Sequence, residues 1–144
     1  MKKILPFVPL FFMLTACGDE NPHSQETSSP SPFTPSEQDV VNEHGNITNL
    51  TRFEDFFTSV QQSKKDAVRI IAYTTEGDPI IKDVQFNGST IKYTLDTTRD
   101  GYGQQEVTIT NCKSIEKIET DETTKYQIAG CENETDGTLL VVDQ

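Results

Sequence analysis

The sequence predicts an α+β domain in which one N-terminal amphipathic helix packs on an antiparallel β-meander of about six strands. Apolar residues recur with the period of a helix over residues 50–60 and with the period of strands after residue 67. Clusters of Gly, Asn, Asp and Pro separate the strand-like stretches, as expected of turns. The roughly 105 residues from position 39 to 144 are enough for one domain with a modest core.

The predicted helix has an apolar stripe at helical spacing, formed by Leu50, Phe53, Phe57 and Val60 and widened by Phe56. This spacing predicts a helix of about 13 residues with one face in the core. Thr48 or Asn49 stands where a side chain can cap the first turn.

After the helix, alternation predicts strands over residues 67–74, 80–86, 90–95, 106–119, 124–131 and 138–142. The long fourth strand is expected to place Val107, Ile109 and Ile115 on one face. Asn87-Gly88 predicts a two-residue type I′ hairpin turn. In that register Val84 faces Ile91, Lys82 faces Tyr93, and Ile80 faces Leu95, so one face collects the apolar residues.

Cys112 and Cys131 are predicted to form a disulfide. A hairpin centred on Asp121-Glu122 places them directly opposite each other in a non-hydrogen-bonded pair. There the Cα atoms approach to about 4.5 Å, within reach of a disulfide. Two free thiols or a redox pair are the alternatives, although the wide spacing lacks the Cys-x-x-Cys character of redox sites.

The N-terminus has the features of a bacterial lipoprotein leader. Basic Met1-Lys2-Lys3 precedes an apolar run from Ile4 to Leu14, which is far shorter than the roughly 20 residues of a membrane-spanning helix. Leu14-Thr15-Ala16-Cys17 has the form of a lipobox. We expect residues 1–16 to be removed and Cys17 to carry diacylglycerol, two acyl chains being enough for stable anchoring. The alternative is a cysteine that ends an ordinary signal peptide by chance.

Residues 17–38 are predicted to form a disordered Pro/Ser-rich tether, because this composition buries too little apolar surface to fold. The globular domain is expected over residues 39–144, at the outer face of the cytoplasmic membrane. Removing residues 1–16 leaves 10 basic and 23 acidic residues, a net charge of −13. Such a charge argues against nucleic acid as a partner and favours a solvated surface.

Three acidic loops, at residues 75–79, 96–103 and 132–137, are expected to meet at one end of the meander. They carry Arg99 as their only cation and the carboxylates of Glu76, Asp78, Asp96, Asp100, Glu132, Glu134 and Asp136. Convergent carboxylates suit Ca²⁺, and the stretch from Asp96 to Gly101 begins like an EF-hand loop. Val107 stands where that loop requires glutamate, so solvated acidic turns are favoured over a metal site.

No catalytic constellation is evident in the sequence. The two histidines are His23 in the predicted tether and His44 before the helix, which leaves little for a nucleophile–histidine pair. A glycine-rich phosphate loop is also missing from the sequence.

The chain resembles a family of small lipoproteins from Gram-positive, spore-forming bacteria, catalogued as a domain of unknown function, number 4362. The resemblance covers about residues 39–131. It rests on the stretches Asp39–Gly45, Tyr73–Ile80 and Asp96–Gly103 and on the two cysteines Cys112 and Cys131. It implies an exported lipoprotein without an assigned activity, and it directs attention to the loops at 75–80 and 96–103.

These observations predict a non-enzymatic, lipid-anchored domain that binds an envelope protein or another envelope ligand. Glu76, Asp78, Asp96, Arg99 and Asp100 are the candidate binding residues. The alternative is a Ca²⁺-dependent module that uses the same carboxylates, and a third possibility is an accessory hydrolase.

Overall fold

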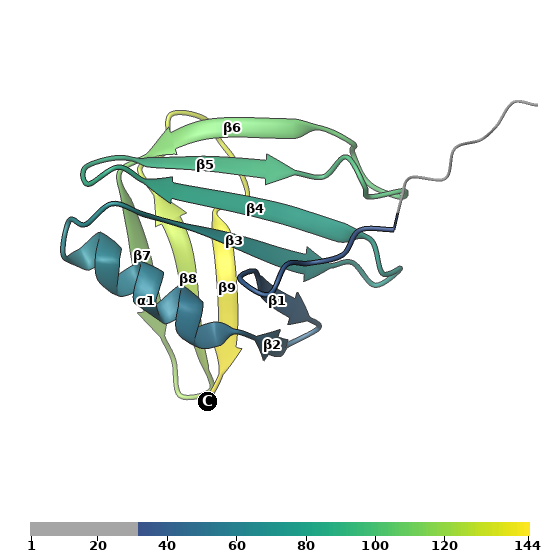
Figure 1. The fold of residues 1–144 in the computed structure, drawn as a ribbon, viewed down its shortest axis with the longest axis horizontal. Coiled ribbons are helices and arrows are strands. Elements are labelled where there is room, and N and C mark those ends of the chain that lie inside the picture. The colour runs from purple at the N-terminus through teal and green to yellow at the C-terminus, as the bar shows by residue number, and fades with distance from the viewer. Residues whose placement is uncertain (1–31) are drawn as a thin grey trace, which may run out of the picture.

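The computed structural model describes residues 32–144. The predicted signal peptide, Cys17 and the tether up to residue 31 lie outside the described residues. The described chain forms one helix and nine strands (Figure 1): β1 Val40–Glu43, β2 Asn46–Thr48, α1 Leu50–Gln61, β3 Asp66–Tyr73, β4 Pro79–Phe86, β5 Ile91–Asp96, β6 Val107–Cys112, β7 Ser114–Glu119, β8 Thr123–Ala129 and β9 Thr138–Asp143.

The strands form two sheets, and the prediction of one meander of about six strands is therefore wrong in number and layout. Sheet A has six strands in the order β2-β1-β3-β4-β5-β6, and sheet B has the order β7-β8-β9. The strands of sheet B run at a steep angle to those of sheet A (Figure 1). The fold is mostly β with one short helix, an α+β domain only in a loose sense.

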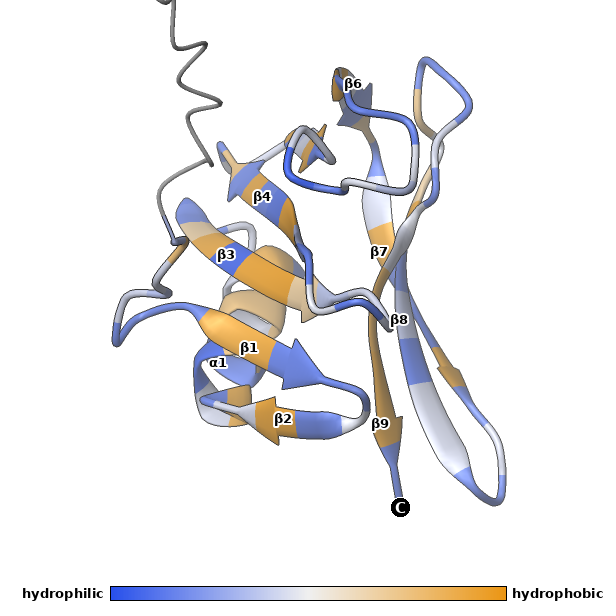
Figure 2. Cartoon of the chain, turned by 90° about the vertical axis from the view of Figure 1, so that its right-hand side faces the viewer, coloured by the Kyte–Doolittle hydropathy of each residue, from blue (hydrophilic) through white to orange (hydrophobic). Residues whose placement is uncertain are grey.

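The hydrophobic core lies between the two sheets. One face of sheet A, here called the inner face, meets both α1 and sheet B, whereas the opposite outer face looks away from them (Figure 2). Tyr126 of sheet B stands edge-on to two rings of α1, with centroids 4.8 Å from Phe53 and 5.2 Å from Phe57. Such edge-to-face pairs stabilise a core beyond the area that they bury.

The helix lies where its apolar stripe predicts. Phe53 and Phe56 are fully buried, and Leu50, Phe57 and Val60 pack partly buried against the core. Asn49 occupies the N-cap position in a left-handed conformation, but its side chain makes no cap hydrogen bond. Instead its Nδ2 donates to the carbonyl oxygens of Glu37 and Asp39, so Asn49 fixes the chain that enters β1.

Strands β1 and β2 were not predicted. They form a hairpin whose two turn residues, His44 and Gly45, both have positive φ, as a type I′ turn requires. The chain then returns through α1, which places β1 parallel to β3. Parallel pairing needs such a crossover connection, so the helix is the link between two neighbouring strands of sheet A.

The predicted register of the β4–β5 hairpin is wrong by two residues. Val84 pairs with Tyr93, and Phe86 pairs with Ile91, around a turn that comprises residues 87–90. The Asn87 side chain accepts hydrogen bonds from the backbone N–H groups of Ser89 and Thr90, and of the Asn87-Gly88 pair only Gly88 has positive φ. A side-chain-directed turn therefore replaces the type I′ turn. A shift of two keeps each side chain on its predicted face.

The predicted strand over residues 106–119 is two strands that belong to different sheets. Lys113 separates β6 from β7, and the buried face changes there from Thr110 and Cys112 to Ile115. Val107 and Ile109, predicted to share a face with Ile115, are more than half exposed on the outer face. Passage between two sheets thus interrupts an alternation that looks continuous in the sequence.

The predicted disulfide is present. Sheet B pairs β7 with β8 in the predicted register, from Ser114 opposite Ala129 to Glu119 opposite Thr124. Cys112 and Cys131 are bonded just beyond this ladder, with their Cα atoms 3.9 Å apart. Because Cys112 ends β6 and Cys131 follows β8, the bond joins the two sheets at their corner.

The last residues of the predicted tether lie against the domain. The backbone N–H of Ser36 donates to the Asp39 carboxylate, and the N–H of Asp39 donates to the Ser36 carbonyl. Asp39 is buried, and Phe33 is half-buried. The chain thus makes contacts with the domain from about residue 33 onward, which is six residues before the predicted start of the domain at residue 39. Over residues 32–144, α1 is too short and too polar to cross a membrane.

Candidate functional site

Two of the three predicted acidic loops come together at one end of sheet A, here called the loop end. They are residues 74–78, between β3 and β4, and residues 97–106, between β5 and β6 (Figure 1). The N–H of Gly101 donates to Oδ2 of Asp78 at 2.9 Å and joins the two loops. The opposite end of the sheet, with the Asn87–Thr90 turn, is here called the turn end.

Loop 74–78 is closed on itself by Thr74. The Thr74 hydroxyl and carbonyl oxygens accept hydrogen bonds from the N–H groups of Asp78 and Gly77, and the Thr74 N–H donates to the Asp78 carbonyl. This tight loop fixes the position from which the Asp78 carboxylate reaches Gly101. Glu76, at its tip, is exposed.

Loop 97–106 is folded around the carboxylates of its own aspartates. Asp96 accepts from the N–H and hydroxyl of Thr98, and Asp100 accepts from the N–H groups of Tyr102 and Gly103. A Cβ at Gly103 would collide with the Asp100 carboxylate, so this close approach requires glycine. The loop presents Tyr102, which is 82% exposed, toward solvent.

A hollow of about 230 Å³ lies at the loop end beside these loops. It is lined by Pro32, Phe33, Tyr73, Gly77, Asp78, Pro79 and Arg99. The Arg99 guanidinium lies over the Phe33 ring, 5.3 Å from the ring centroid. A cation, aromatic rings and a proline together can hold an aromatic or proline-containing group, and the guanidinium can also pair with an anion.

The third acidic loop does not lie at the loop end, contrary to the prediction. Glu132 accepts from the amide of Asn111 near the turn end, and its N–H donates to the Asn111 carbonyl. Further on, the Tyr93 hydroxyl donates to the Asp136 carbonyl, and Lys82 Nζ donates to the Thr138 carbonyl. The loop therefore runs across the inner face of sheet A, because the chain enters sheet B instead of continuing the meander.

Burial changes the acid–base properties of the two residues that hold this loop. Burial lowers the pKa of Lys82, although nearby Asp136 opposes the change. Burial also raises the pKa of Tyr93, and Asp136 adds to that increase. Both side chains serve as hydrogen-bond donors to backbone carbonyls, a structural role in the core.

The carboxylates at the loop end are not arranged as a metal site. Within residues 32–144, no three His, Cys, Asp or Glu side chains lie close enough together to hold a metal ion. Asp78 and Asp100 already accept backbone N–H groups. Binding of Ca²⁺ at these loops would therefore require those hydrogen bonds to be exchanged for coordination.

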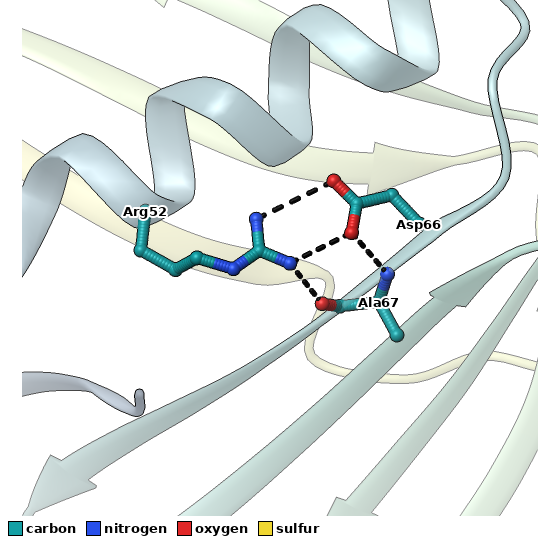
Figure 3. A network of polar contacts seen from close by, with 3 residues as sticks. All are labelled: Arg52, Asp66 and Ala67. Carbon is teal, nitrogen blue, oxygen red and sulfur yellow. Dashed lines mark hydrogen bonds and ion pairs between the residues drawn. The ribbon is translucent and has the colours of Figure 1, made fainter. Parts of the chain in front are cut away.

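At the turn end, a polar network covers the free edge of β3 where β1 no longer pairs with it (Figure 3). Arg52 of α1 binds both carboxylate oxygens of Asp66, at 2.7 and 3.4 Å, and also the Ala67 carbonyl. Burial raises the pKa of Asp66, but hydrogen bonds from Arg52, Ala67 and Ser59 outweigh burial and leave that pKa lowered. The network therefore fastens the helix to the sheet.

The sequence pointed to the two loops, with Pro79 in the first of them, and to Arg99, but missed Phe33 and Tyr73. Phe33 stands in the Pro/Ser-rich segment assigned to the tether, and Tyr73 was assigned to a strand. The available signal was one aromatic residue between two prolines in an otherwise polar segment, Pro32-Phe33-Thr34-Pro35. Such a residue is out of place in a solvated tether.

Neither the curated proteins nor the solved structures include a match to this chain. A family described as "Domain of unknown function (DUF4362)" matches residues 37–127, which include α1, all of sheet A and the start of sheet B. The match covers more than half of the 144 residues and includes both loops of the loop end. The chain therefore belongs to the DUF4362 family.

Proposed function

We propose that this protein is an exported lipoprotein, anchored by diacylglycerol on Cys17, whose domain binds another component of the cell envelope through the loop end. The binding role needs no catalysis, and the groups that line the hollow supply cationic, aromatic and apolar contacts. The observation that carries the proposal is the meeting of two loops around the hollow that contains Arg99.

The chemistry of the hollow supports recognition. Arg99 offers a planar cation that stacks on rings and binds anions, and Tyr73 and Pro79 add apolar surface. The segment that connects toward Cys17 meets the domain at this same end, through Phe33 (Figure 1). An anchor at Cys17 would therefore connect to the domain at its loop end.

Site-specific photo-crosslinking in the native membrane tests the binding role. A photoreactive residue at Glu76, exposed at the loop end, is expected to capture a discrete partner, whereas one at Ser89, exposed at the turn end, is expected not to. Arg99→Ala should abolish the product from position 76. Equal products from both positions, or products unaffected by Arg99→Ala, would remove the proposal.

The anchor has its own test. Mass spectrometry of the mature protein is expected to find an N-terminus at Cys17 with a thioether-linked diacylglycerol. A mature protein that starts elsewhere, or that carries a free thiol at Cys17, would contradict the anchor while leaving the loop end open to test.

A further inference from the structure

The hollow at the loop end is lined on one side by an aromatic side chain from the segment before β1. Phe33 is half-buried, with its ring beneath the Arg99 guanidinium, and Pro32 also lines the hollow. The segment has no regular secondary structure and no strand partner. Phe33 thus meets the domain through its side chain, which packs against Arg99, and not as part of the sheet.

The chain on the C-terminal side of Phe33 is held independently. Hydrogen bonds between Ser36 and Asp39, and from Asn49 to the carbonyl of Glu37, fix residues 36–39 to the domain. Loss of the Phe33 contact would therefore free only the short stretch before Ser36. Pro32 and Pro35 restrict that stretch to extended conformations, which lowers the entropy lost when it docks.

We propose that the surface formed by Tyr73, Pro79 and Arg99 is a docking site for an extended peptide segment with an aromatic residue next to proline, and that Pro32–Pro35 covers this surface in cis and leaves the hollow beside it. This inference rests on the proposed function, since it names the ligand class and the regulation of the same hollow. An external segment of the same chemistry must displace Phe33 before it binds.

The cis segment, residues 32–35, competes only moderately with an external peptide for the docking site. A short connection to residue 36 gives it an effective concentration on the order of millimolar. A single cation–π contact at a partly exposed site is weak, so the segment can be released by a ligand that makes more contacts. When the cis segment is docked, an external ligand therefore binds only if its affinity for the site is high enough to displace Phe33.

Fluorescence of a single tryptophan tests whether Phe33 is docked. The chain has no tryptophan, so F33W supplies the only one. In the full chain in detergent, its emission is expected to be blue-shifted, to shift red in the F33W/R99A variant, and to shift red when unlabelled peptide of residues 32–38 is added in excess. Emission typical of exposed tryptophan in F33W itself would overturn the cis occupancy.

Peptide binding tests the ligand class. A dye-labelled peptide of residues 32–38 is expected to bind full-length Phe33→Ala at least about tenfold more tightly than the unmodified chain, because the competing cis ring is gone. Thr34→Ala, an exposed neighbour of Phe33, is the matched control and should behave like the unmodified chain. Adding Arg99→Ala to Phe33→Ala should abolish binding.

Equal affinity for the unmodified chain and for Phe33→Ala would overturn the proposal, as would no binding to Phe33→Ala with an unchanged melting temperature. These outcomes are separate from the crosslinking result. A crosslinked partner at Glu76 combined with an exposed F33W would keep the proposed function and remove the cis occupancy.

Discussion

Different interactions stabilise the two ends of sheet A. At the turn end, the Cys112–Cys131 disulfide joins the two sheets and Arg52 fastens α1 to Asp66 and Ala67. At the loop end, most hydrogen bonds of the aspartates stay within their own loop, and one bond, from Gly101 to Asp78, joins the two loops. The turn end is therefore held by a covalent cross-link and a charge-assisted contact, whereas the loop end shapes a surface.

This difference separates stability from recognition. A covalent cross-link persists in the unfolded chain and restricts its conformations, so the disulfide contributes strongly to stability. Short-range hydrogen bonds at exposed positions contribute little to stability but determine the shape that a partner meets. Substitutions at the turn end should mainly lower stability, and substitutions at the loop end should mainly change binding.

Loss of the disulfide is expected to have the largest effect. The bond spans 19 residues of sequence, and replacing both Cys112 and Cys131 by Ser should lower the free energy of unfolding by about 3 kcal/mol. Urea denaturation measures the change. Arg99→Ala is the loop-end control, for which a change below about 0.5 kcal/mol is expected. Equal losses for the two would contradict the division between the ends.

Arg52→Ala is expected to cost about 1 kcal/mol at pH 7, since it removes charge-assisted hydrogen bonds from a partly buried carboxylate. The pKa of Asp66 is lowered in the folded state, so its contribution to stability is present above the ordinary carboxyl pKa of 3.8 and is lost as the pH falls through the folded-state pKa. The free energies of unfolding of the unmodified protein and of Arg52→Ala, measured by urea denaturation, should therefore differ less below pH 4 than at pH 7. A difference independent of pH would contradict the role of Asp66.

Asp78→Ala is expected to cost no more than about 1 kcal/mol, because it removes one partly exposed hydrogen bond between the loops. Its effect on binding should be larger. In the Phe33→Ala background we expect it to weaken binding of the residue 32–38 peptide severalfold, measured by fluorescence anisotropy. Thr120→Ala, in the β7–β8 turn away from the hollow, is the matched control and should leave peptide affinity unchanged.

Addition of Ca²⁺ is expected to have the smallest effect. The carboxylates of Asp78 and Asp100 already accept backbone N–H groups, so calorimetry of the full chain with millimolar Ca²⁺ should show no saturable heat. Saturable heat that disappears in Asp100→Asn would instead favour the Ca²⁺-dependent module and would show that the loop end binds a cation.

The elements that the sequence predicts well are those set by local pattern. The stripe around Phe53 predicts α1, and the symmetry of Cys112 and Cys131 about the β7–β8 turn predicts both that register and the disulfide. In these regions the local preferences and the final packing agree, which makes a prediction from one sequence reliable.

The errors occur where a side chain or a change of sheet overrides local pattern. Asn87 uses its side chain to close a longer turn, while the type I′ turn occurs at His44-Gly45, where no hairpin was predicted. Strands β1 and β2 are only four and three residues long, too short for a clear alternation. Lys113 sits where the chain passes between sheets, a change that alternation alone does not reveal.

The candidate site was partly predictable for the same reason. Turn chemistry identified the loops of Asp78 and Arg99, and chain order along sheet A brings them together. Phe33 was missed because composition assigned its whole segment to a tether, and one aromatic residue changes that composition little. Its contact with Arg99 depends on where β5 and β6 hold loop 97–106, which only the folded structure provides.

The most direct test compares amide hydrogen exchange of the protein in its own membrane with that of the purified protein. We expect added protection in loops 74–78 and 97–106, where a partner would bind, and unchanged exchange in the turn at residues 87–90. Protection that appears only at the turn end, or in neither region, would contradict the loop end as the binding surface.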